Sequence, residues 1–117
     1  MRSRRDLKSF IDLPYQLFAG DPVWVPPLRM DIEMTLSRTK NPFFEHAESE
    51  YFLAERSGTV VGRIAAIENR LHNETHADRV GFYGWFDCID DQAVANALFA
   101  TVESWLRERK LDVMRGP

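Results

Sequence analysis

The chain has 117 residues, of which 44% are hydrophobic and 28% are charged, and its formal net charge is −3. A chain of this length supports one domain with a single modest core. The negative balance provides no basic field across the surface. We therefore expect neither nucleic acid nor a membrane as a partner.

Two observations favour a cytoplasmic location. Cys88 is the only cysteine, which excludes an intrachain disulfide of the kind common in secreted domains. Asp12 and Pro14 interrupt the apolar stretch that a signal peptide would need. No uncharged apolar run approaches the roughly 20 residues that span a bilayer.

The first forty residues predict two helices joined by an extended segment. Apolar residues near helical spacing predict a helix over residues 6–19, which Pro14 should break or kink. Three prolines hold residues 22–27 extended, and we expect this segment to lie across the core with Trp24 buried beneath it. A second helix is predicted from about Leu28 to Ser37, with its apolar face formed by Leu28, Ile32 and Leu36.

Residues 50–56 and 59–69 predict a hairpin whose tight turn is Ser57-Gly58. Strict alternation in the second strand places one set of side chains on one face and the next set on the other. The first set is Val61, Arg63, Ala65 and Ile67, and the second is Gly62, Ile64, Ala66 and Glu68.

Residues 71–79 are predicted to form a polar loop. His72 and His76 flank Glu74 in this loop, which superficially resembles a zinc-binding spacing. The glutamate stands one position too late for the metalloprotease pattern, and no third ligand is nearby beyond Asp78. We therefore expect no metal site.

The last third of the chain predicts a strand, a long helix and the start of another strand. Residues 80–89 are apolar at both alternating positions, which is typical of a central strand covered on both faces. Residues 91–110 predict an amphipathic helix that Asp90 or Asp91 can cap. Residues 111–114 then enter the next strand.

This order of elements resembles the N-terminal half of the GNAT superfamily of N-acetyltransferases, and more narrowly a bacterial group of longer GNAT-like proteins. The stretches that carry the resemblance are D-P-V-W-V-P-P-L, N-P-F-F-E-H-A, V-G-R-I-A-A-I-E-N, G-F-Y-G-W-F-D and the closing R-G-P. The resemblance implies a three-layer α+β fold: a mainly antiparallel sheet with one parallel pair across two splayed strands, flanked by helices. It also implies that residues 1–117 are a single partial domain, with the first strand missing or reduced to Met1–Arg4 and the C-terminal half absent.

The resemblance further implies acetyl-CoA or another acyl-CoA as a substrate. In the superfamily the pantetheine arm lies between the splayed strands, and the pyrophosphate sits on backbone amides at the start of the long helix, where anions are favoured. This chain has no glycine there, and Asp90 and Asp91 add negative charge, so we expect weaker phosphate contacts. By resemblance, the cofactor-binding backbone would be that of Phe86, Asp87, Cys88, Ile89, Gln92 and Ala93.

Acyl transfer needs a base that takes a proton from the attacking amine. Glu68 and Asp87 are the candidate catalytic residues, because they lie in or beside the predicted central strands, where partial burial tunes a carboxylate. The alternative is that both are strand-end or edge carboxylates facing water. Cys88, within a central strand, is expected to be an inert thiol.

Two functions from different classes remain open. The chain could be the N-terminal part of an acyl-CoA N-acyltransferase-fold protein, inactive alone because the superfamily's late strands and tyrosine are not in it. Alternatively, it could be a non-catalytic interaction module whose sheet is completed by self-association or a partner. This second function predicts a homo-oligomer formed through open strand edges.

Overall fold

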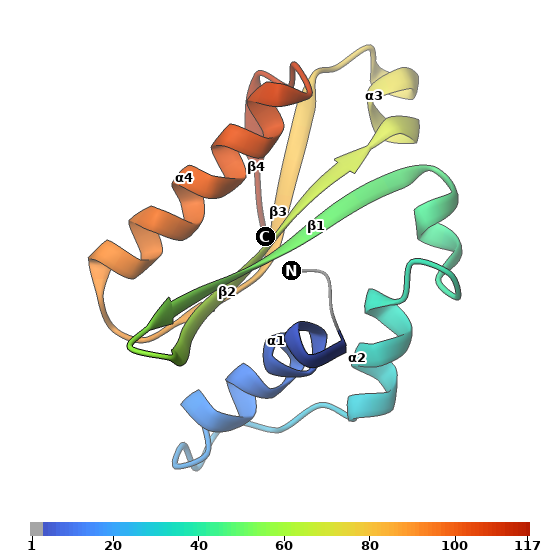
Figure 1. The fold of residues 1–117 in the computed structure, drawn as a ribbon. Helices are drawn as coiled ribbons and strands as arrows, with labels where there is room; N and C mark the ends of the chain where they lie inside the picture. The colour runs from blue at the N-terminus through green and yellow to red at the C-terminus, as the bar shows by residue number, and fades with distance from the viewer. Residues whose placement is uncertain (1–3) are drawn as a thin grey trace.

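The computed structural model describes residues 4–117. Met1–Ser3 lie outside the described residues, so the expected first strand falls mostly on positions about which nothing is said, and Arg4 already belongs to a helix. The elements follow in the order α1 (Arg4–Leu17), α2 (Arg29–Leu36), the 3-10 turn η1 (Pro42–Glu45), β1 (Ala47–Arg56), β2 (Thr59–Asn69), α3 (Arg70–His76), β3 (Val80–Cys88), α4 (Gln92–Glu108) and β4 (Val113–Arg115) (Figure 1).

The four strands form one mixed sheet in the order β1-β2-β3-β4. β1 pairs antiparallel with β2, and β2 pairs antiparallel with β3. β3 and β4 are parallel, as expected for strands joined through a crossover helix, which here is α4. The predicted mainly antiparallel sheet with one parallel pair is confirmed.

Helices cover both faces of this sheet, which confirms the three-layer α+β fold. Figure 1 shows α4 on one face and α1 with α2 on the other. On the α4 face, buried residues of β2 meet the predicted apolar face of the helix, and on the other face Phe10 packs against Tyr51 with ring centroids 5.2 Å apart. The two buried clusters are Val61, Ile64, Ala66, Val94, Leu98, Val102, Leu106 and Leu111 on the α4 face, and Phe10, Ile11, Ile32, Leu36, Tyr51 and Ala65 on the other.

The prediction that Pro14 breaks the first helix is wrong, because α1 continues through Pro14 to Leu17. Proline has no N–H, so it cannot bond the carbonyl of Phe10 four residues earlier. The guanidinium of Arg63 donates to that carbonyl instead, at 2.7 Å. A tertiary contact thus replaces the hydrogen bond that Pro14 removes, and the helix tolerates the proline.

The segment between α1 and α2 does not cross the core as predicted. It runs along the side of α1 that faces away from the sheet (Figure 1). Trp24 is half-buried against Tyr15 and Phe18, with ring centroids 5.5 and 5.6 Å away. α2 confirms the second predicted helix, but Leu28 precedes it and is exposed, whereas Ile32 and Leu36 are buried.

The hairpin is confirmed with its turn at Ser57-Gly58, where both residues have positive φ, at 52° and 80°. Strict alternation fails at Val61. In the register, Ala54 faces Gly62 while Glu55 faces Val60, so Val61 is the extra residue of a β-bulge. The bulge places Val61 with Ile64 and Ala66 beneath α4, not on the face of Ala65.

The predicted loop after β2 contains a helix instead. Asn69 caps α3 by accepting from the amide of His72, and Ala77 ends it with φ of 53°. The Asn73 side chain then bonds both the N–H and the C=O of Val80, at 3.1 Å each, which ties the helix to the start of β3. These polar residues looked like loop residues because their hydrogen bonds are formed at helix ends and across a turn.

No helix among residues 4–117 has the length and apolar character that crossing a bilayer requires.

Candidate functional site

The candidate cofactor site lies where β3 ends and α4 begins. β4 pairs only with the first part of β3, from Val80 to Phe82. Beyond Phe82, no strand among residues 4–117 pairs with β3 on its β4 side. The later part of β3 therefore has one edge in the ladder with β2 and one edge free of a neighbouring strand.

The backbone of β3 alternates between these two edges. The amide of Ile89 donates to the carbonyl of Val61 at 2.9 Å, so Ile89 faces β2. Because alternate residues of a strand point to opposite edges, Asp87 also faces β2, while Phe86 and Cys88 face the open edge. Of the four residues at and just after the end of β3 that were expected to contact a cofactor, two thus have backbone groups directed to the open side.

A second bulge shapes this stretch of β3. Arg63 faces Asp87 while Ala65 faces Gly84, so Trp85 and Phe86 together oppose Ile64. Trp85 has φ of 55°, a left-handed conformation that costs a bulky residue about 1 kcal/mol or more. The bulge bends β3 within the stretch that has an open edge. Phe86, at the bulge, packs on Phe99 of α4, with ring centroids 4.7 Å apart.

The N-terminus of α4 already holds a carboxylate of the chain itself. Asp91 caps the helix by accepting from the amide of Ala93 at 2.9 Å, and it bonds Arg56 at 2.6 Å. The Arg56 guanidinium, helped by the Ala93 amide, lowers the pKa of Asp91 below its ordinary value. The side chain of Gln92 is bonded to Asn96. An incoming phosphate would therefore compete with Asp91 for the positive end of the helix.

The Cys88 thiol is not set up as a nucleophile. Burial raises its pKa, and the nearby carboxylates of Asp87, Asp91 and Asp90 raise it further. A thiol with a raised pKa stays protonated at neutral pH, and only the thiolate attacks efficiently. The prediction of an inert thiol agrees with this environment.

Asp87 is bound to a buried arginine. The Nη2 and Nε atoms of Arg63 donate to its Oδ2 at 2.9 and 3.2 Å. The guanidinium is almost fully buried and lies over the rings of Phe10 and Trp85, 5.0 and 5.5 Å from their centroids. Asp87 therefore ends in an ion pair with Arg63, while its side chain remains 24% exposed.

Glu68 is also bound to an arginine, at the opposite end of β2. Arg109, which follows α4, donates to Glu68 at 2.8 Å and to Glu48 at 2.6 Å. Arg63, the partner of Asp87, lies five residues earlier in β2, which is roughly 17 Å along a strand. The structure therefore does not bring the two candidate catalytic carboxylates together, and each is engaged by a guanidinium.

No cluster of three or more His, Cys, Asp or Glu side chains within residues 4–117 is arranged to hold a metal ion. The rings of His72 and His76 do lie close together, with centroids 4.6 Å apart and planes tilted by 44°, and His72 Nε2 lies 3.4 Å from Asp78. His72 also packs edge-on against Phe82.

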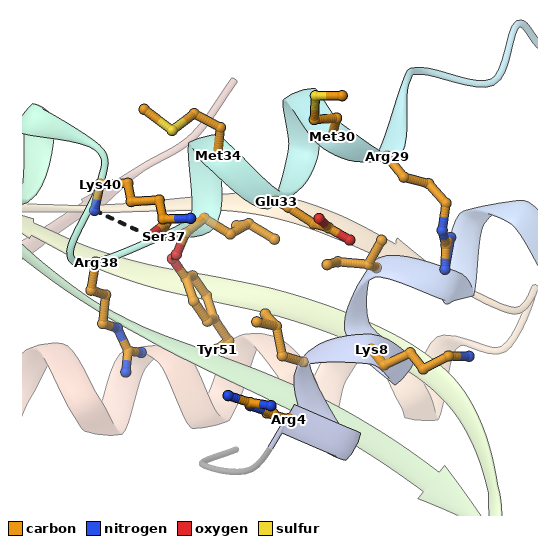
Figure 2. Close-up of a pocket in the computed structure, with 13 residues that line it drawn as sticks. Arg4, Lys8, Arg29, Met30, Glu33, Met34, Ser37, Arg38, Lys40 and Tyr51 are labelled. Atoms are coloured by element: carbon orange, nitrogen blue, oxygen red, sulfur yellow. Dashed lines mark hydrogen bonds between the residues drawn. The ribbon is translucent and has the colours of Figure 1, made fainter.

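A groove that the sequence did not predict lies between α1, α2 and β1. Its volume is about 1050 Å³, and Figure 2 shows Tyr51 in its middle, between the two helices. Apolar residues and cations share the lining. The residues are Arg4, Leu7, Lys8, Ile11, Arg29, Met30, Glu33, Met34, Leu36, Ser37, Arg38, Lys40 and Tyr51.

The fold of this chain is that of part of a GNAT-like protein. The structure of a tandem GNAT protein from the clavulanic acid biosynthesis pathway, solved without AcCoA, matches 92% of this chain with a TM-score of 0.69 and 15% sequence identity. The match covers 31% of that protein's chain. The predicted N-terminal half of a GNAT-like protein is thus confirmed at the level of the fold.

Two curated proteins are similar to the chain in sequence. Protein YghO of Escherichia coli (strain K12) is 38% identical over 115 residues, or 98% of this chain. The bacterial ceramide synthase of Caulobacter vibrioides (strain NA1000 / CB15N) is 42% identical over 118 residues, or 100% of this chain. The chain spans only 29% and 31% of these relatives' lengths. No protein-family model matches it.

Proposed function

We propose that this chain is the N-terminal part of an acyl-CoA-dependent N-acyltransferase-fold protein, and that it has no transferase activity by itself. The observation that carries the proposal is the open edge of β3 beside β4, next to the start of α4, in a GNAT-like fold. The Caulobacter relative is named a ceramide synthase. Ceramide contains an amide between a fatty acyl group and an amine, so acyl transfer to an amine is the reaction class that this name supports.

In this proposal the backbone of Phe86 and Cys88 hydrogen-bonds the amides of the pantetheine arm. These residues face the open edge, whereas Asp87 and Ile89 belong to the ladder with β2. Gln92, the first residue of α4, contributes its backbone amide to the pyrophosphate. The amide of Ala93 joins it only when a phosphate displaces Asp91 from the helix end.

The proposed inactivity follows from where the carboxylates are held. A general base must come within hydrogen-bond reach of the proton that it removes. Asp87 is turned towards α1 by Arg63, and Glu68 is held by Arg109 at the far end of β2. We propose structural roles for both, with the acid and base groups supplied by polypeptide beyond this chain, as the greater length of the relatives allows.

Calorimetric titration with acetyl-CoA tests the binding part. We expect saturable binding at micromolar concentrations, and no heat at millimolar ligand would refute it. Asp90→Ser removes a charge beside the phosphate site without touching the Asp91 cap, so it should tighten binding about two- to fivefold. Asp112→Ser, an exposed carboxylate before β4, is the matched control and should leave the affinity unchanged.

An assay for free CoA thiol tests the inactivity separately. The chain is incubated with acetyl-CoA, or with a long-chain acyl-CoA, and a panel of primary amines. We expect thiol release no faster than in the protein-free blank. Turnover by the 117-residue chain would refute the inactivity but not the binding proposal. Absence of acetyl-CoA binding in the calorimetric titration would refute the binding proposal but not the inactivity.

A second function, a non-catalytic module completed by self-association, is favoured by one observation. β1 is an edge strand of ten residues, and the carbonyl of Ser49 bonds an arginine side chain, Arg38, rather than another strand. By alternation the backbone of Leu53 faces the same open edge. Light scattering should then show a dimer that Leu53→Pro disrupts, because proline removes an outward N–H. A monomer at every concentration would exclude this function.

A further inference from the structure

The segment from Val23 to Met34 carries an unusual apolar surface. Val23, Val25 and Met30 are 84%, 83% and 77% exposed, and Leu28 and Met34 are exposed as well. We call these five residues the α1–α2 surface. Of the eight large hydrophobic side chains exposed among residues 4–117, these five lie within twelve positions of the sequence. Scattered apolar residues need no explanation, but five exposed on one short segment indicate a contact surface.

The backbone of this segment has few unsatisfied donors. Pro22, Pro26 and Pro27 have no N–H. The amide of Val23 donates to the carboxylate of Asp21 at 2.9 Å, and that of Trp24 donates to the carbonyl of Asp21 at 3.4 Å. A segment with few free amide donors can leave water at a lower cost than an ordinary loop.

The segment is also anchored, so its valines are held outward. Trp24 packs on Tyr15 and Phe18, and the Tyr15 hydroxyl donates to the carbonyl of Pro27. The guanidinium of Arg29 lies over the Tyr15 ring, 4.8 Å from its centroid. Because the half-buried tryptophan fixes the segment against α1, Val23 and Val25 on either side of it remain exposed.

Cations line the neighbouring groove. Arg4 and Lys8 come from α1, Arg29 begins α2, and Arg38 and Lys40 follow it (Figure 2). The lining holds one carboxylate, Glu33, against these five cations. Asp12 and Glu50 pair with Lys8, Arg29 and Arg38, and Asp21 and Asp31 lie on or just before the apolar segment. The groove lining is therefore positive, although the whole chain has a net charge of −3.

We propose that the α1–α2 surface docks on an anionic lipid bilayer. The five apolar side chains enter the boundary between headgroups and acyl chains, while the cations of the groove lie against lipid phosphates. This mode of binding lies in the interface and needs no spanning helix. The prediction of no membrane partner was based on the net charge of the whole chain. The fold, however, places cations of and after the helices α1 and α2 beside an apolar segment.

Co-sedimentation of the full 117-residue chain with vesicles tests the proposal. We expect binding to vesicles of phosphatidylcholine mixed with phosphatidylglycerol, much weaker binding to pure phosphatidylcholine, and a loss in high salt. The double variant Val25→Asp with Met30→Asp should weaken binding about tenfold or more, because it places charges at the apolar boundary. Leu71→Asp, at another exposed apolar residue, on α3, should leave binding unchanged.

Charge is tested in the same way. Lys40→Glu should weaken binding to the anionic vesicles, whereas Lys110→Glu, beyond the end of α4, should have little effect. Circular dichroism melting checks that every variant is folded. Absence of vesicle binding, or equal losses in the α1–α2 variants and their controls, would overturn the proposal. So would light scattering that shows a dimer dissociated by the Val25→Asp and Met30→Asp pair, because a second copy would then cover this surface.

Discussion

The missing N–H of one proline determines the partners of three other residues: Phe10, Arg63 and Asp87. Pro14 leaves the Phe10 carbonyl without its helical donor. Arg63 fills that position, and Asp87 compensates the charge that Arg63 brings into the interior. A buried guanidinium without its carboxylate costs several kcal/mol, so these residues are stable only together. The arrangement also holds Asp87, placed near the candidate site by sequence, in an ion pair with Arg63.

A double-mutant cycle tests this dependence. Arg63→Met should destabilise the protein by about 3 kcal/mol, because it leaves the Phe10 carbonyl and Asp87 without a partner. In the Pro14→Ala background the cost should be about 1 kcal/mol smaller, since the introduced alanine supplies an N–H to that carbonyl. The free energies of unfolding come from urea titrations at neutral pH. Additivity of the two changes to within about 0.3 kcal/mol would contradict the proposed link.

The C-terminus of α4 ends in a Schellman motif with an unfavourable residue. The amide of Leu111 bonds the carbonyl of Leu106 at 3.0 Å, and the amide of Lys110 bonds that of Arg107 at 2.9 Å. Lys110 has φ of 61°, where glycine is the usual residue. Leu106 and Leu111 are both buried in the cluster beneath α4, which supplies the hydrophobic contact of the motif. Packing therefore holds a left-handed lysine in place.

Replacing that lysine should stabilise the protein. Lys110→Gly removes the steric cost of the left-handed conformation and should raise the free energy of unfolding by about 0.5–1 kcal/mol. Arg107→Gly, inside the last turn of α4, should lower it by about 1 kcal/mol. Thermal and urea unfolding measure both. A destabilised Lys110→Gly variant would show that the lysine side chain, not its backbone, matters at this position.

α4 approaches the sheet closely over two glycines, Gly62 of β2 and Gly81 of β3. A Cβ at Gly62 would lie 2.8 Å from the Leu98 side chain, and one at Gly81 would overlap Leu106. Gly81→Ala should therefore cost about 1–3 kcal/mol through overpacking. Gly20→Ala, which meets nothing within 4 Å, is the control and should change stability little. Equal effects in denaturant titrations would show that α4 shifts freely on the sheet.

The charged surface makes the whole molecule sensitive to acid. Arg109 and Arg70 lower the pKa of Glu48, and Arg56 with the Ala93 amide lowers that of Asp91. For a group whose pKa is lower in the folded than in the unfolded state, the stabilisation is fully present above the unfolded value. It is lost as the pH falls through the folded value. The ordinary values are 4.5 for Glu48 and 3.8 for Asp91, so the loss belongs below pH 4.5.

Melting temperature as a function of pH checks this expectation. The wild type should melt higher than the Glu48→Gln/Asp91→Asn variant at neutral pH, because the substitutions remove both charge-assisted interactions. Asparagine keeps the helix cap, so the comparison isolates charge. The difference should shrink steadily below about pH 4, where the wild-type carboxylates become protonated. A difference that is constant with pH would refute the electrostatic origin.

A helix or strand could be predicted from the sequence where its apolar pattern and its capping or turn residues all lie within one short segment. α4 has its apolar face and its cap within one stretch, and the hairpin has its turn residues between two apolar runs. α3 was missed because its stabilising hydrogen bonds involve Asn69 and Asn73, which are typical of loops as well as helix ends. Pro14 misled the prediction for α1 because its compensation comes from Arg63, 53 residues away along the chain from Phe10.

The elements around the candidate site could be predicted, but the contacts of its residues could not. The open edge of β3 and the start of α4 are where the resemblance placed a cofactor. Sequence could not show that Asp91 occupies the helix end or that Glu68 and Asp87 are held by arginines, because each partner lies far away along the chain. The groove between α1 and α2 was missed for the same reason, since three separate elements line it.

The sequence by itself determined the main helices and strands other than α3, because local periodicity, capping and turn chemistry act within a few residues. The family resemblance of the sequence supplied the arrangement of the sheet. Only the tertiary structure decided which polar groups are partnered, where β-bulges shift the faces of β2 and β3, and which charges gather around the α1–α2 groove. Those outcomes depend on which segments, distant along the chain, come into contact. The energy of a buried ion pair or apolar surface depends on the groups around it in the folded protein and not on the residues alone.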